Sequence, residues 1–108
     1  MDLRANQLLS LLMDLEMHLR SASLWQTHSP SQAALASTQP FCVDTLEFQQ
    51  WLQFVFIPRL RVLAETDQPL PLQCNVAPMV NDGDVFTGVN ARAEIVHTLE
   101  QIDALISN

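Results

Sequence analysis

Apolar residues recur with helical spacing in the first segment of the chain. From residue 2 to about residue 21, Leu8, Leu12, Leu15 and Leu19 follow one another at steps of three or four, and polar residues occupy the opposite positions. This pattern predicts an amphipathic helix. Other apolar residues widen the stripe, so we expect the helix to contact two neighbours or a partner chain. These residues are Leu9, Leu11, Met13 and Met17.

A second helix is predicted to begin at Asp44. Asp44 can cap the helix, Glu47 can return a bond to the cap, and Val43 can pack on Phe48. The helix is almost wholly apolar apart from a narrow polar strip, so we expect it to form the buried centre of the fold. The strip consists of Gln49, Gln50 and Gln53.

Pro58 interrupts this second pattern. It has no backbone N–H, and its ring clashes with the carbonyl of Phe54 in a regular helix. We therefore predict a kink at Pro58, after which the helix continues toward Ala64.

Shorter elements are predicted from turn and capping signals. Ser29 to Gln32 has the form of a capping box, which favours a short helical turn from Pro30 to Leu35. The alternating prolines of residues 69–72 indicate an ordered, extended loop across the bundle. Pro78 can open a short helix that residues 81–84 end.

The last helix is predicted to be capped by Asn90. Its inner face consists of Ile95, Val96, Leu99, Ile102 and Ile106. No sustained apolar and polar alternation argues for a sheet. The predicted fold is therefore all-α, a compact bundle of about four helices with a Pro-kinked, buried central helix. Residues 1–108 fit the size of a single domain.

The charge of the chain excludes several classes of partner. Five Arg, no Lys and twelve Asp or Glu give a formal net charge of −7, which repels phosphate backbones and anionic membranes. No apolar stretch approaches the roughly 18 residues of a membrane span. We therefore expect no direct nucleic-acid binding and no membrane insertion.

The cysteines and the first segment favour a cytoplasmic protein. Cys42 and Cys74 form no Cys-x-x-Cys, and the first segment carries acidic residues in place of a cleavable apolar run. We interpret the two cysteines as reduced thiols. A disulfide is the alternative, because the sequence does not give their separation.

The motifs that could hold a metal are better explained as surface features. Glu94 and His97 have the spacing of di-iron bundle ligands, but only one such pair occurs and it lies on a polar helix face. Asp14 and His18 form an ordinary surface pair one turn apart. The acidic turn at residues 81–84 lacks the ligands of a calcium loop. We expect no metal, no cofactor and no catalytic residue.

Two charged residues fall where helical phase would place apolar ones. Arg59 follows Leu52 and Val55, and Asp103 follows Val96 and Leu99. They either pair across a helix interface or lie at its edge, with Arg59 swung outward by Pro58.

The chain resembles the YqcC-like family of small bacterial proteins. The resemblance rests on short stretches in the same order and spacing: residues 37–41, Asp44-Thr45, residues 51–53, residues 57–59, residues 76–78, and Leu99 with Ile102-Asp103. It implies a compact bundle of about four helices and a family without an assigned biochemical role. Some members carry names tied to tRNA pseudouridine synthase C, but that activity is not expected here, because the chain has neither a sheet signal nor a basic surface.

The function predicted from these observations is a non-enzymatic protein-binding module, with an accessory role in RNA modification as one such role. The alternative is a small-molecule-binding protein or an enzyme that uses a cleft near Phe41, Asp44 and Trp51. Self-association is left open. The predicted binding residues are Trp25, Gln39, Pro40, Phe41, Asp44, Trp51 and Arg59.

Overall fold

Three long helical segments form the body of the molecule in a computed structural model that describes residues 3–83 and 85–107. They are α1 (Leu3–Ser21), a continuous run of α3 (Phe48–Trp51), η2 (Leu52–Phe56) and α4 (Ile57–Glu65), and α6 (Arg92–Ser107). Shorter helical elements complete the fold, and no strand occurs among the described residues. The predicted all-α bundle is confirmed. Asp2 and Asp84, which the predicted helix and turn include, lie outside the described residues.

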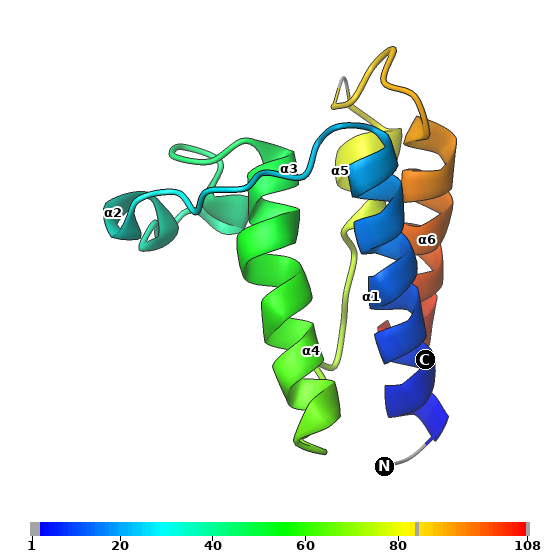
Figure 1. Cartoon of the computed structure of the whole chain (residues 1–108). Coiled ribbons are helices and arrows are strands. Elements are labelled where there is room, and N and C mark those ends of the chain that lie inside the picture. The colour runs from blue at the N-terminus through cyan, green and yellow to red at the C-terminus, as the bar shows by residue number, and fades with distance from the viewer. Residues whose placement is uncertain (1–2, 84, 108) are drawn as a thin grey trace.

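Helix α1 occupies the middle of the bundle, with α4 on one side and α6 on the other (Figure 1). The predicted stripe of Leu8, Leu12, Leu15 and Leu19 is fully buried. The widened stripe serves two neighbouring helices, as one of the two sequence-based alternatives predicted, although Met13 and Met17 remain exposed. The predicted inner face of α6 is also buried.

The second helix begins at Phe48, so the prediction that Asp44 caps it is wrong. Glu47 is the N-cap residue, and its backbone N–H donates to Gln50 Oε1 at 2.8 Å. Asp44 and Val43 are exposed before the helix. The reason is a tight turn in which the carbonyl of Cys42 accepts from the N–H groups of both Thr45 and Leu46.

The irregularity expected at Pro58 takes the form of a widened turn. Residues 52–56 are π-helical, and the N–H of Ile57 donates to the carbonyl of Leu52. The wider spacing of hydrogen bonds in a π turn relieves the clash that the ring of Pro58 would have with a carbonyl of a regular helix. The helix can therefore continue to Glu65. The run is also not central, because α1 lies between it and α6.

Residues 22–47, which we call the arm, project from the bundle beside α3 (Figure 1). The arm contains α2 (Gln32–Leu35) and the single turn η1 (Pro40–Cys42). The cap of α2 is Ser31 and not Ser29, since Ser31 Oγ accepts from the N–H of Ala34 at 3.1 Å. Cys42 and Leu46 are buried within the arm, apart from the main hydrophobic core.

Helix α5 (Ala77–Asn81) starts with Pro78 in its first turn, as predicted. Helix α6 starts at Arg92, so Asn90 is not its cap. The cap position falls on Ala91, whose carbonyl accepts from the N–H of Ile95 and whose backbone is left-handed, with φ of 68°. The left-handed backbone of Ala91 thus precedes the helix, and nothing in the sequence indicated it.

Two side chains of α6 hold α5 at both of its ends. Asp103 accepts from the N–H groups of Val76 and Ala77 at 2.9 to 3.0 Å. Arg92 donates to the carbonyl of Val80 at 2.5 Å, beyond which the helix ends. Asp103 therefore does not pair with Arg59, and its partners are backbone groups that sequence spacing does not reveal.

Both cysteines are free thiols, as the favoured interpretation predicted. Cys42 is buried in the arm, whereas Cys74 is half-buried beside the end of α6. Burial, a hydrogen bond with Asp103 and the charge of Asp103 raise the pKa of Cys74 to about 12. Among the described residues, no helix has the length and apolarity needed to cross a membrane.

Candidate functional site

An aromatic cluster joins the arm to the start of the second long helical run. The ring of Phe41 lies 4.9 Å from that of Trp51 and 6.1 Å from that of Phe48, centroid to centroid. Phe48 and Trp51 stack on each other at 5.8 Å, and each also contacts a ring of the main core, Phe86 and Phe56 respectively. Such contacts add to the free energy gained from burial. Phe41 and Trp51 therefore anchor the arm to the bundle.

The backbone of Phe41 is unusual for a bulky residue. Phe41 and Cys42 are consecutive residues with left-handed φ angles of 58° and 50°. Conformations of this kind persist only where surrounding contacts compensate for their cost. Here the compensation is the packing of Phe41 on Trp51 and the burial of Cys42.

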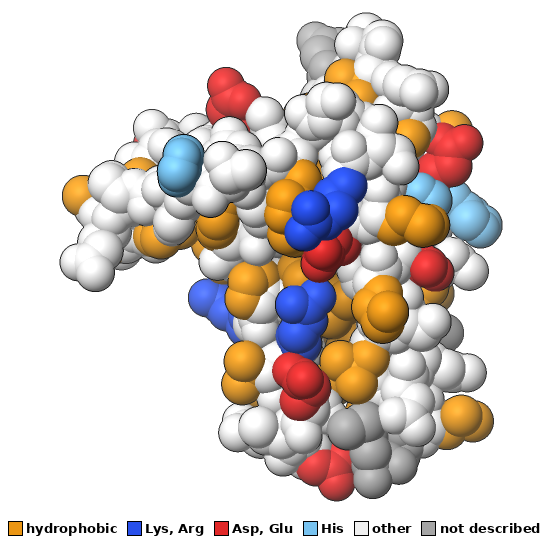
Figure 2. Space-filling model, in the orientation of Figure 1, with side chains coloured by type: hydrophobic (Ala, Val, Ile, Leu, Met, Phe, Trp, Pro, Cys, Tyr) orange, Lys and Arg blue, Asp and Glu red, His pale blue; other side chains and the backbone are white. Residues whose placement is uncertain are grey.

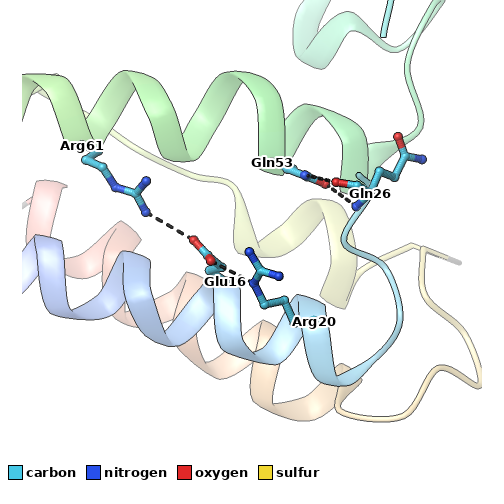
Figure 3. A network of polar contacts seen from close by, with 5 residues as sticks. All are labelled: Glu16, Arg20, Gln26, Gln53 and Arg61. Atoms are coloured by element: carbon cyan, nitrogen blue, oxygen red, sulfur yellow. Dashed lines mark hydrogen bonds and ion pairs between the residues drawn. The ribbon is translucent and has the colours of Figure 1, made fainter. Parts of the chain in front are cut away.

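A second attachment joins the root of the arm to η2 (Figure 3). The Gln53 side chain accepts from the Gln26 N–H and donates to the Gln26 carbonyl, both at 2.8 Å. Gln53, which the sequence placed on the narrow polar strip of this helix, is only 7% exposed. A buried amide needs partners, and the backbone of Gln26 supplies both of them.

The tip of the arm is tied together by short polar contacts. Asp44 accepts from Ser37 Oγ at 2.5 Å, and the Thr45 hydroxyl donates to the carbonyl of Ala34 at 2.7 Å. The carboxylate of Asp44 thus closes a loop and does not cap a helix. Gln39 and Pro40 lie between these contacts and are exposed.

Trp25 lies at the root of the arm, where it packs against the main core. The guanidinium of Arg20 covers its ring at 4.8 Å from the centroid. Glu16 pairs with Arg20 at 2.9 Å and with Arg61 at 3.5 Å, which links α1 to α4 (Figure 3). Trp25 is therefore half-covered by a cation that is itself held in place.

The arm overhangs a hollow on the outer side of α4. The hollow has a volume of about 520 Å³ and combines one arm residue with residues of η2 and α4. Figure 2 shows hydrophobic side chains gathered beneath the overhang and along this helix. The lining consists of Leu35, Phe54, Val55, Pro58, Arg59, Val62 and Leu63.

Arg59 is the charged residue in this apolar lining. The other four arginines all have partners: carbonyls of residues 105 and 106 for Arg4, Glu16 for Arg20 and Arg61, and carbonyls of the 80–85 stretch for Arg92. Arg59 is exposed, and its guanidinium makes no hydrogen bond, ion pair or cation–π contact within the described residues. The alternative in which Arg59 swings outward is the one observed.

The predicted binding residues thus fall into three places. Gln39, Pro40, Phe41 and Asp44 lie on the arm with Trp51 beneath them, Trp25 lies at its root, and Arg59 lies across the hollow on α4. Sequence reasoning missed the residues that complete the hollow. Val62 continues an apolar helical pattern past Pro58, but nothing in the sequence indicated that its side chain would be 54% exposed.

The polar clusters that resemble metal sites stay open to solvent. Glu94 and His97 are exposed on α6, and His18 of α1 lines a neighbouring hollow with them. Across the part of the chain that the structure describes, no group of three or more His, Cys, Asp or Glu residues could hold a metal ion.

These features define a small all-α protein with a projecting arm and an apolar hollow beneath it. The family described as tRNA pseudouridine synthase C, DUF446, matches residues 7–105. The chain belongs to this family, so the resemblance drawn from the sequence is confirmed.

Three relatives illustrate what the chain is similar to. It is 40% identical over 94 residues to the uncharacterised protein YqcC of Escherichia coli, covering 87% of this chain and 85% of that protein. It is 31% identical over 103 residues to an uncharacterised protein of Haemophilus influenzae, covering 95% of each. The solution NMR structure of E. coli YqcC superimposes with a TM-score of 0.84 at 36% identity, covering 99% of this chain and 91% of that one.

A further relative is much longer than the chain. A Pectobacterium carotovorum protein named tRNA pseudouridine synthase C is 41% identical over 68 residues. The match covers 63% of this chain but only 18% of that protein. Most of the named protein therefore lies outside the region of similarity.

Proposed function

We propose that this chain is a non-enzymatic, cytoplasmic protein-binding module that assists an RNA-modifying enzyme. It docks through the hollow between the arm and α4, and the exposed arm residues Gln39 and Pro40 offer further contacts. The observation that carries the proposal is the hollow itself, which Arg59 lines together with the exposed Val62 and with partly exposed apolar side chains.

The construction of the arm supports a docking role. The arm is attached to the bundle by the Phe41–Trp51 contact and by the paired hydrogen bonds of Gln26 and Gln53. A surface held at two points loses little conformational freedom on binding, which favours affinity. An exposed apolar patch beside it typically marks an interaction site.

The long Pectobacterium relative suggests the kind of partner. A region similar to this chain is part of a protein named tRNA pseudouridine synthase C, and most of that protein lies outside the similarity. Two functions joined in one chain in one organism are often separate, interacting chains in another. The net charge of −7 also complements the basic surface that an RNA-binding enzyme presents.

A small-molecule-binding protein or an enzyme is the second candidate. The hollow, at about 520 Å³, falls within the range of roughly 300 to 1,000 Å³ typical of ligand pockets, but it is wide open to solvent and would enclose a ligand only in part. The cleft for this alternative is then the hollow on α4 and not the surface near Phe41, Asp44 and Trp51, because the rings of Phe41 and Trp51 are packed against each other.

The test is direct binding to the tRNA pseudouridine synthase of the same bacterium, measured by isothermal titration calorimetry. We expect a saturable one-to-one complex with the wild type. We also expect complex formation to be lost on Val62→Asp, which places a carboxylate in the hollow, and retained on Met13→Asp, the same kind of change at an exposed residue of α1. A metabolite panel added in a thermal-shift assay should leave the melting temperature unchanged. A ligand at 100 times its Kd would instead raise the free energy of unfolding by about 2.7 kcal/mol. Failure of the synthase to bind would overturn the assignment of this partner.

A further inference from the structure

The charge of the hollow differs from that of the whole molecule. The chain carries −7 overall, yet the lining of the hollow includes Arg59 and no Asp or Glu. Of the two arginines on α4, Arg61 already pairs with Glu16, whereas the guanidinium of Arg59 has no polar or cation–π partner within the described part of the chain. The local surface is therefore apolar with one available cation.

Any partner that covers the hollow also covers the guanidinium of Arg59, which then needs a hydrogen-bond acceptor in place of water. A purely apolar segment would remove the guanidinium from water without giving it an acceptor, which costs more than apolar contact returns. A basic segment would add repulsion to that cost. A carboxylate satisfies the guanidinium with up to two parallel hydrogen bonds.

We infer that the hollow between the arm and α4 binds a partner segment that combines apolar side chains with one carboxylate, which pairs with Arg59. The apolar side chains contact Leu35, Phe54 and Val62, and the carboxylate reaches the guanidinium at the edge. This inference rests on the proposed docking function and specifies the chemistry of the segment that docks.

The experiment is selection of a random 12-residue phage-displayed peptide library on immobilised full-length protein. Three baits are compared: the wild type, Arg59→Glu, and Arg61→Glu as a control with the same charge change on the same helix. Circular dichroism first establishes that all three baits are folded. No partner needs to be known in advance, so the outcome is independent of whether the synthase binds.

The expected wild-type pool is enriched in Leu, Phe, Met and Trp together with Asp or Glu, and depleted in Lys and Arg. The Arg59→Glu pool loses the acidic preference and gains a basic one, while the Arg61→Glu pool matches the wild type. A synthesised wild-type peptide should bind Arg59→Glu more weakly by at least about tenfold, as expected for loss of a charged hydrogen bond.

Two results would overturn the inference. If the peptides selected on the wild type and on Arg59→Glu were apolar and had the same content of Asp and Glu, Arg59 would not select the partner. The docking proposal would then still stand. If the peptides selected on the wild type were no more enriched in apolar and acidic residues than those from an uncoated surface, the hollow would not bind a short segment. In that case calorimetry with the whole synthase still decides the proposed function separately.

Discussion

Asp103 shows how one side chain of α6 fixes a second element. Its two oxygens accept from the N–H groups of Val76 and Ala77, which are the groups left unpaired at the start of α5. The helix that it holds is only five residues long, so it has few internal hydrogen bonds of its own. The position of α5 therefore depends on the contacts that α6 makes with it.

The first prediction concerns the stability provided by Asp103. Asp103→Ala should lower the free energy of unfolding by about 1 to 2 kcal/mol, the upper part of the range for a lost cap. Asp103→Asn keeps one acceptor oxygen and should cost less. Urea unfolding measures both, and Glu100→Ala, at an exposed position of the same helix, should change the value by no more than about 0.5 kcal/mol. An Asp103→Ala variant as stable as this control would contradict the capping role.

The second prediction concerns Cys74, whose thiol lies close to Asp103. Because burial first, then the hydrogen bond and charge of Asp103, raise its pKa from 9.0 to about 12, the thiol stays protonated at pH 8. In a Cys42→Ser background, modification by a thiol reagent should therefore be slow in the folded protein and fast in urea. Asp103→Asn should move the onset of reactivity to lower pH, because it removes the negative charge.

The raised pKa of Cys74 also fixes the sign of a stability change. The folded state binds the thiol proton more tightly than the unfolded state, so this contribution is complete below about pH 9.0. It is lost as the pH rises from there toward 12. Unfolding of the Cys74→Ala variant should show a smaller loss over that range. A folded thiol with an ordinary pH profile would contradict both expectations.

At the scale of single residues, the sequence identified unusual positions more reliably than their partners. Arg59 and Asp103 were recognised because they interrupt apolar helical patterns, and both are distinctive in the structure. The partners of Asp103 are backbone groups of a loop 26 and 27 residues away, which no spacing rule encodes. The prediction for Asp44 failed for a similar reason, because the N–H groups that the cap would have served have other acceptors, the carbonyl of Cys42 for Leu46 and the side chain of Gln50 for Glu47.

Among the elements, the arm is the one whose placement depends on a few specific contacts. It has only a small buried cluster of its own, around Cys42 and Leu46. The arm is held to the bundle by the ring of Phe41 on Trp51, by the Gln26–Gln53 pair and by the packing of Trp25 at its root against the core. Loss of one of these attachments should loosen the arm before the bundle unfolds.

The third prediction tests the Gln53 attachment. Gln53→Leu leaves the N–H and carbonyl of Gln26 without their partners and should cost about 1 to 3 kcal/mol of stability. Hydrogen exchange should speed up across residues 22–47 while α1 and α6 stay protected. Gln49→Leu, a similar change at a partly exposed site on the same helix, should have neither effect. Unchanged exchange in the arm of Gln53→Leu would show that the Phe41–Trp51 contact and the packing of Trp25 hold the arm without the Gln53 attachment.

The sequence predicted the existence of the helices better than their ends. Long apolar stripes identified α1 and α6, because burial of one face follows directly from helical spacing. The starts near Ser29, Asp44 and Asn90 were each displaced, since capping side chains compete with nearby turns for the same backbone groups. The π turn before Pro58 depends on how the backbone relieves a clash, which composition does not determine.

In the molecule as a whole, most of the few cationic side chains bind other groups of the same chain. Four of the five arginines bind carbonyls or Glu16 within the chain, and there is no Lys. The exposed acidic side chains therefore face solvent with little compensation. This distribution could be inferred from the sequence only as a net charge, because the pairing of each arginine depends on the tertiary arrangement.

The fourth prediction follows from that distribution. Binding to RNA gains most of its non-specific free energy from cations that neutralise phosphates, and here only Arg59 is available among the described residues. The isolated protein should show no tRNA binding tighter than about 10⁻⁴ M at physiological salt, the weak end of non-specific binding. Fluorescence anisotropy with labelled tRNA at low and physiological salt is the measurement.

A matched variant makes this negative expectation informative. Reversing three exposed acids, Asp14→Lys, Glu94→Lys and Glu100→Lys, should produce weak tRNA binding that disappears as salt is raised. Such a response would show that the assay detects electrostatic binding and that the native charges prevent it. Micromolar, salt-resistant binding by the wild type would instead mean that bases or RNA shape are recognised without phosphate neutralisation. The protein would then contact the RNA itself, and its role could not be limited to binding the modifying enzyme.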